Sequence, residues 1–188
     1  MVLTMLKRII GLKRALNEKE FIVSLVGAFI ATLLASFFSD MILIAEEMPL
    51  ILASTGASAI LLFALPLSPV SQPWNLVGGH VISAFVGVSC YVFIPNELLA
   101  SSFSIFFAML FMHVFRCMHP PGGATAITAV VGGANVHALG YAYIVLPVFV
   151  NSIILLSVAM AVGMSREVNP FEVQEVETEK EGIDKSEE

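Results

Sequence analysis

The feature of this sequence that most constrains its fold is a long central stretch that carries almost no charge. Between Pro49 and Gly163 the formally charged residues, histidine aside, are Glu97 and Arg116. Of all 188 residues, 57% are hydrophobic and 13% are charged, whereas soluble domains carry about 25% charged residues. No soluble domain fits in such a stretch, and in lipid a helix satisfies its own backbone polar groups. The sequence therefore predicts an all-α polytopic membrane protein.

Apolar runs separated by helix-breaking residues predict six membrane segments. Their approximate ranges are 21–44, 49–65, 76–94, 102–117, 121–131 and 141–164. The loop 66–75 holds three prolines and is not expected to form a regular helix. The fifth segment has about 11 helical residues, which cover only ~17 Å of a ~30 Å hydrocarbon core. It therefore needs either extended residues to complete the crossing or a re-entrant path.

The charged ends predict the orientation of the chain. Five basic residues precede the first segment: Lys7, Arg8, Lys13, Arg14 and Lys19. The positive-inside rule predicts a basic cytoplasmic segment (1–20), a transmembrane domain (21–164) and an acidic, disordered cytoplasmic tail (165–188). These features predict a multi-pass protein of the cell (inner) membrane with both termini cytoplasmic. A cleaved signal peptide is the alternative, but residues 21–38 exceed a usual signal core and no cleavage site follows them.

A helix-breaking run, HPPGGATA, interrupts this apolar sequence at residues 119–126. Membranes tolerate irregular backbone where protein or a cavity satisfies its polar groups, so the run predicts a site. Pro120 and Pro121 favour a helix start, and Gly122 and Gly123 remove side chains from its first turn. Such a bare helix N-terminus presents free backbone N–H groups that bind small anions. We therefore expect residues 119–125, namely His119, Pro120, Pro121, Gly122, Gly123, Ala124 and Thr125, to bind the substrate.

A weaker copy of this run occurs earlier in the chain. Residues 56–60, GASAI, match residues 123–127, GATAI, 67 positions further along. Two interrupted segments in corresponding places predict a 3+3 inverted repeat, 21–95 and 101–164, with opposed half-helix N-termini near the membrane midplane. Gly56, Ala57 and Ser58 then form the second half of the site. The alternative is a four-span protein in which the second and fifth segments are re-entrant.

Histidines and one arginine complete the predicted site. His80 lies one turn inside the third segment, where an ionisable group is costly unless it faces a cavity or a partner. His80 or His119 is predicted to carry a proton with the anion, since imidazole titrates near neutral pH. Arg116 is either a cytoplasmic anchor or an electrostatic gate for anions. No metal site is expected, because His113 and His119 are six positions apart and no further ligand set completes them.

Three blocks of this sequence resemble the HPP family of integral membrane proteins. They are residues 56–63 (GASAILLF), 68–80 (SPVSQPWNLVGGH) and 119–126 (HPPGGATA), and the resemblance runs from about Gly56 to Gly163. It implies a compact membrane protein, and members in cyanobacteria and plastids are associated with nitrite transport. A basic residue often stands in the family where this chain has Trp74, so any anion-attracting charge of that loop is missing here.

Together these features predict a transporter or channel for a small inorganic anion, with nitrite favoured by the resemblance. No enzyme is expected, because no nucleophile, base and orienting acid occur together, and no cofactor or nucleic-acid partner is expected. A channel for a small neutral solute and a membrane-bound regulatory or interaction subunit are the alternatives. Self-association in the lipid bilayer is left open, since a chain this small often needs it to shield broken helices.

Overall fold

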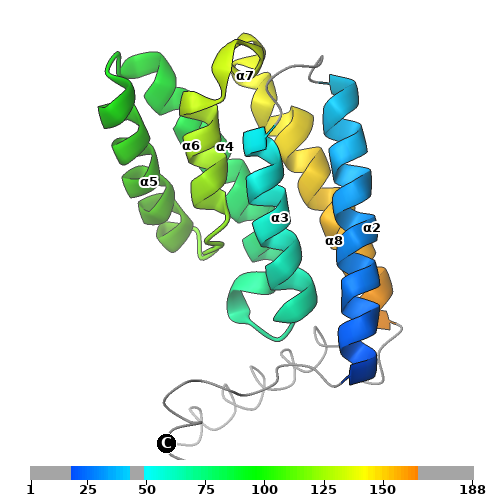
Figure 1. Ribbon diagram of the computed structural model, residues 1–188. Helices are drawn as coiled ribbons and strands as arrows, with labels where there is room; N and C mark the ends of the chain where they lie inside the picture. The colour runs from blue at the N-terminus through cyan, green and yellow to red at the C-terminus, as the bar shows by residue number, and fades with distance from the viewer. Residues whose placement is uncertain (1–17, 43–48, 165–188) are drawn as a thin grey trace, which may run out of the picture.

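The computed structural model describes residues 18–42 and 49–164, which form a bundle of helices that run alternately in opposite directions (Figure 1). Every regular element in these two ranges is helical, as the sequence predicts. One set runs in one direction: α2 (Glu18–Ile42), α4 (Pro73–Phe93) and α6 (Gly122–Val131). The other set runs in the opposite direction: α3 (Pro49–Ala64), α5 (Glu97–Val114) and α8 (Val150–Met164).

Helix length separates the bundle into long and short members. Four helical stretches are long and apolar enough to cross a membrane: Lys19–Met41, Pro73–Phe93, Glu97–Val114 and Ile144–Gly163. The shorter apolar helices are α3 and α6, which confirms that the second and fifth predicted segments are short. Each of the two is a single helix within the bundle (Figure 1), and six crossings remain a prediction.

Two regions differ from the predicted segments. The proline-containing loop is ordered as a short turn, η1 (Pro69–Ser71), and α4 starts at Pro73, because proline suits the first position of a helix. The sixth predicted segment is not one helix. It is preceded by α7 (Gly133–Leu139) and begins with η2 (Ile144–Phe149), in which Leu146 before Pro147 leaves the helical conformation (φ −122°, ψ 106°).

Small residues bring α4 and α6 into close contact. A Cβ atom placed on Gly122 would lie 2.6 Å from Ser83 Oγ, and one on Gly79 would lie 2.5 Å from His119 Cβ. A Cβ atom on Gly87 would likewise be too close to the backbone of Ala126. Small residues let membrane helices pack backbone to backbone. His80, which follows Gly79 in α4, is thereby held against the start of α6.

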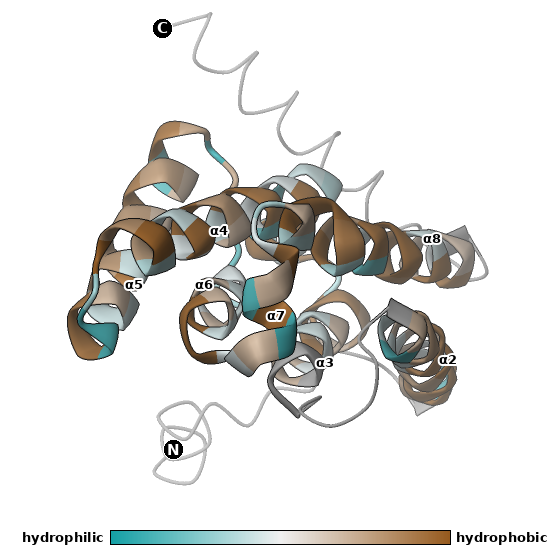
Figure 2. Ribbon diagram, turned by 90° about the horizontal axis from the view of Figure 1, so that it is seen from above, coloured by the Kyte–Doolittle hydropathy of each residue, from teal (hydrophilic) through white to brown (hydrophobic). Residues whose placement is uncertain are grey.

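The short helices lie at the centre of the bundle, as the view along its axis shows (Figure 2). α3 contacts α6, while α5 and α2 occupy the two outer ends. The outer helices expose large apolar side chains such as Phe29 and Phe106. Buried polar side chains instead gather where α3, α4, α6 and α8 meet, including Ser58, His80 and Thr125. The candidate site therefore lies inside the bundle, away from lipid.

Candidate functional site

Four buried polar side chains form one hydrogen-bonded chain across the centre of the bundle. Thr125 Oγ1 lies 2.7 Å from His80 Nδ1, and His80 Nε2 lies 2.8 Å from Ser58 Oγ. Ser58 Oγ also lies 2.9 Å from His119 Nε2, and His119 Nδ1 lies 2.8 Å from the Val70 carbonyl oxygen. Each of the four side chains is at most 5% exposed. We call this set, Thr125–His80–Ser58–His119, the histidine chain.

The Val70 carbonyl determines the direction of every bond in the histidine chain when both imidazoles are neutral. A carbonyl accepts only, so His119 donates from Nδ1 and its Nε2 accepts from the Ser58 hydroxyl. Ser58 has one hydroxyl hydrogen, so its oxygen must accept from His80 Nε2. His80 Nδ1 is then an acceptor, and the Thr125 hydroxyl donates to it. The neutral chain has a single arrangement, in which each donor points towards Val70.

The loop before α6 is fastened to the first turn of α4. Trp74 Nε1 donates to the Phe115 carbonyl at 3.1 Å, and Asn75 Nδ2 donates to the Met118 carbonyl at 2.8 Å. These bonds satisfy the Phe115 carbonyl at the end of α5 and the Met118 carbonyl in the following loop. They hold the backbone on either side of Arg116, so that His119 reaches Ser58.

The structure corrects the expectation of free amides at the start of α6. Its first backbone N–H groups donate to the carbonyls of the turn that precedes the helix: Gly122 to His119 at 2.9 Å, Gly123 to Pro120 at 3.0 Å, and Ala124 and Thr125 to Pro121 at 3.1 and 3.3 Å. The Pro-Pro-Gly-Gly run folds as tight turns whose carbonyls occupy the amides that an open helix end would leave free. Backbone amides are therefore not available to an anion here.

The expectation of opposed helix N-termini is also wrong. Residues 56–58 lie inside α3, which begins at Pro49, so their amides are within the helix. A Cβ atom on Gly56 would meet nothing within 4 Å, and Ala57 is exposed. Pro49 starts α3 well upstream because proline suits the first turn of a helix. Ser58 reaches the site through its side chain.

The predicted residues therefore divide into two groups. Ser58, His80, His119 and Thr125 meet in the histidine chain, whereas the flanking residues of the two runs do not join it. Gly123 and Ala124 are half-buried, and a Cβ on Gly123 would meet only Ile105 Cδ1, at 3.3 Å. Pro120 is exposed, while Pro121 and Gly122 are buried in the turn. Arg116 is exposed in the α5–α6 loop with a left-handed backbone (φ 53°), outside the chain.

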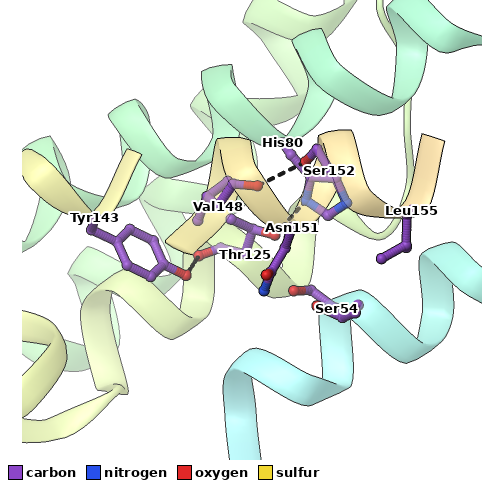
Figure 3. A pocket seen from close by; sticks show the side chains of 9 residues that line it. Ser54, His80, Thr125, Tyr143, Val148, Asn151, Ser152 and Leu155 are labelled. Carbon is purple, nitrogen blue, oxygen red and sulfur yellow. Dashed lines mark hydrogen bonds between the residues drawn. The ribbon is translucent and has the colours of Figure 1, made fainter. Parts of the chain in front are cut away.

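A small cavity lies beside His80 (Figure 3). Its volume is about 10 Å³, about what one water molecule needs. Nine side chains line it: Ser54, Thr55, His80, Thr125, Tyr143, Val148, Asn151, Ser152 and Leu155. Tyr143 donates its hydroxyl to the Thr125 carbonyl at 3.3 Å. The histidine chain thus ends at the cavity wall.

Of the residues that line the cavity, the sequence analysis predicted His80 and Thr125 as site residues and missed the others, including Asn151 and Tyr143. Asn151 lies in the apolar run 144–163, where a polar amide is costly, and this signal was available. Tyr143 is 1% exposed and gave no comparable signal, because aromatic residues are common near the ends of membrane segments. Tyr143 directly precedes η2, and the sequence pattern did not predict the break in the helix there.

The sequence that forms this site matches a known protein family. The family model for the HPP transmembrane region matches residues 13–169, a range that contains the histidine chain and the cavity. The chain belongs to the HPP family. The HPP protein is similar to two proteins of Dictyostelium discoideum that are named as transmembrane proteins, at 35% identity over 144 residues and 33% over 121 residues.

The match covers 74% and 62% of this HPP chain, respectively, and 46% and 42% of the two relatives. The chain therefore spans less than half the length of these relatives. No solved structure matches it significantly.

The site of this HPP protein carries no formal charge among the residues that the structure describes. His119 faces His80 with ring centroids 4.9 Å apart, Tyr143 lies across the cavity, and Cys117 packs against Gly78 beside the site. The charged residues of the described ranges lie at helix ends, within the first or last turn of α2 or at either end of α5. The described residues contain no cluster of three or more His, Cys, Asp or Glu side chains that could hold a metal ion.

Proposed function

We propose that this HPP protein is a membrane transporter or channel for a small inorganic anion, with nitrite the leading candidate, and that it takes up a proton with the anion. The observation that carries the proposal is the histidine chain. It holds two imidazoles in the interior, joined through Ser58 and without an acidic partner among the described residues. Ionisable groups inside a membrane domain are costly and mark substrate or proton pathways.

A proton added to His80 reverses the hydrogen bond at the cavity wall. In the neutral chain Thr125 donates its hydroxyl hydrogen to His80 Nδ1. An imidazolium donates from both nitrogens, so Nδ1 then donates to Thr125 Oγ1, and the hydroxyl hydrogen turns towards the cavity. The cavity thereby gains a donor and a neighbouring positive charge in one step.

That positive charge favours an anion as the ligand. An unpaired charge in the low-dielectric interior costs several kcal/mol, in order-of-magnitude terms, and here no described carboxylate offsets it. A small anion in the cavity supplies the missing charge and accepts from Thr125. The neutral cavity has room for about one water molecule, so anion entry requires the surrounding helices to move apart, as alternating access does.

The packing of the helices supports an inverted repeat and six crossings. An inverted repeat would make α2 equivalent to α5, α3 to α6 and α4 to α8. If the helices are exchanged in this way, each pair of these helices in contact becomes a pair that is also in contact. The pairs α2–α3, α2–α8 and α3–α8 become α5–α6, α5–α4 and α6–α4, while α3–α6 and α4–α8 map onto themselves. Exchanged helices run in opposite directions (Figure 1). Under this symmetry Ser58 and Thr125 are equivalent, and they bind opposite sides of the His80 ring.

The water-sized cavity favours a second candidate, a channel for a small neutral solute. Transport assays on the purified chain in liposomes separate the two functions. Protein-free liposomes measure the passive leak of nitrous acid. A transporter raises nitrite uptake above this leak, most strongly with the outer solution more acidic. A neutral-solute channel instead speeds swelling in the solute without carrying nitrite.

Two histidine variants test the coupling. His80→Gln keeps hydrogen bonding but does not titrate, so acid-stimulated nitrite uptake is expected to fall at least about tenfold. His113→Gln is the matched control, because His113 is exposed at the end of α5. Nitrite uptake equal to that of protein-free liposomes would contradict the anion proposal. Equal acid stimulation in His80→Gln and the unmodified protein would contradict the proton coupling.

A further inference from the structure

Asn151 on α8 carries a buried polar atom without a partner. Its side chain is 5% exposed, and Nδ2 donates to Ser39 Oγ of α2 at 2.7 Å. The other end of the amide, Oδ1, is enclosed and has no hydrogen-bond partner among the residues that the structure describes. Leaving a buried acceptor unpaired costs about 1–3 kcal/mol, so a native site that keeps one has a use for it.

The side chain of Asn151 borders the cavity at the end of the histidine chain. Asn151 extends from α8 between the side chains of Thr125 and Ser54 (Figure 3). Thr125 reaches the same cavity from α6 and His80 reaches it from α4. A ligand in this space therefore touches Thr125 on one side and Asn151 on the other.

The bond to Ser39 allows the amide to present either end. A serine hydroxyl accepts from an N–H and donates to a C=O equally well. If the amide turns by half a revolution, Ser39 donates to Oδ1 and the two N–H groups face the cavity. The number of bonds to Ser39 does not change. The amide can thus offer donors to an anion without losing its anchor on α2.

We infer that Asn151 is a substrate-binding and specificity-determining residue that holds a small anion with two oxygens together with Thr125. The inference rests on the proposed function. One oxygen of the anion accepts from the Thr125 hydroxyl and the other accepts from the Asn151 amide, which reach the cavity from different helices. A planar two-oxygen anion such as nitrite or formate spans both donors, whereas a halide has one atom to share between them. The site therefore binds nitrite and formate in preference to chloride.

Two alanine variants separate binding from a structural role. Asn151→Ala and Ser39→Ala both remove the bond between α2 and α8, but only Asn151→Ala removes the amide from the cavity. Calorimetric titration of the purified full chain in lipid nanodiscs with sodium nitrite, sodium formate and sodium chloride measures affinity. We expect Asn151→Ala to weaken nitrite binding at least about 30-fold and Ser39→Ala less than about fivefold. If Asn151→Ala does not fold, Asn151→Asp keeps the shape, lacks the N–H donors, and is expected to lose nitrite binding.

Each remaining result would overturn the inference. Equal weakening in Asn151→Ala and Ser39→Ala would mean that Asn151 only ties α2 to α8. Chloride binding as tight as nitrite binding would exclude the two-oxygen ligand. Nitrite binding by the unmodified protein that persists unchanged in Asn151→Ala would refute the inference and leave the proposed function intact. Absence of nitrite and formate binding by the unmodified protein would refute both.

Discussion

At the residue scale, Ser58 decides whether the two imidazoles act as one unit. It is fully buried and contacts His80 Nε2 and His119 Nε2, at 2.8 and 2.9 Å. A hydroxyl is suited to this position because it accepts from one ring while donating to the other. A proton added at His80 therefore affects both His119 and the hydroxyl of Thr125.

Replacing Ser58 by alanine tests this role. Ser58→Ala leaves one nitrogen of each imidazole buried without a partner, so we expect stability to fall by about 1–3 kcal/mol per nitrogen and nitrite affinity to fall about tenfold. Ser36→Ala is the matched control, because Ser36 donates to the Thr32 carbonyl of its own helix, and its stability should change by less than about 0.5 kcal/mol. Denaturant titration and calorimetry measure the two quantities. Identical behaviour of both variants would contradict the assigned role of Ser58.

The sequence was sufficient to pick out the members of the histidine chain, because His80 is a costly ionisable group in an apolar segment and the other three lie in the helix-breaking run or its weaker copy. It did not reveal how they meet. Ser58 and Thr125 were expected beside free amides, but the turn before α6 occupies those amides with its own carbonyls. Such local turn geometry depends on backbone angles that residue types alone do not specify. Asn151 was overlooked because a single amide has no motif around it.

At the scale of elements, the contact between α4 and α6 positions His80 against His119 and Thr125. Gly122 faces α4, where Ser83 Oγ and the Gly79 carbonyl leave no room for a side chain. Gly123, its neighbour in sequence, faces the flexible end of Ile105. The helix-breaking run put both glycines in the predicted site, because it did not indicate which face of α6 packs on α4.

Substituting these neighbouring glycines separates the two faces of α6. Gly122→Ala forces α4 and α6 apart, and we expect a loss of stability of about 1–3 kcal/mol together with weaker nitrite binding. Gly123→Ala needs only a small shift of Ile105, so its stability should stay within about 1 kcal/mol of the unmodified protein. Thermal unfolding in detergent compares them. A larger loss in Gly123→Ala than in Gly122→Ala would contradict the packing described for α6.

At the scale of the whole molecule, six helices of alternating direction place the two ends of each short helix at opposite ends of the bundle (Figure 1). Hydropathy alone predicted six segments but left the re-entrant alternative open, since short helices fall below the length of a span. In the folded protein α3 and α6 contact each other at the centre of the bundle, and their crossing of the membrane stays a prediction.

Cysteine labelling tests the crossing of α3 and α4. Cys90 and Cys117 are buried and free, so alanine at both gives a background without reactive thiols. We expect Glu97→Cys, at the start of α5, to react with an impermeant reagent from outside the cell, and Leu67→Cys, an exposed position before η1, to react only from the cytoplasm. Labelling of Glu97→Cys only from the cytoplasm, which the four-span alternative predicts, would contradict six crossings.

We propose that the histidine chain takes up a proton as the anion binds, and counting protons measures this uptake. Purified protein in weakly buffered solution near pH 7 is mixed with sodium nitrite, and an indicator dye records the protons removed from solution. We expect about one proton taken up per nitrite bound, and essentially none in His80→Gln. Nitrite binding by the unmodified protein without proton uptake would exclude proton uptake by the histidine chain.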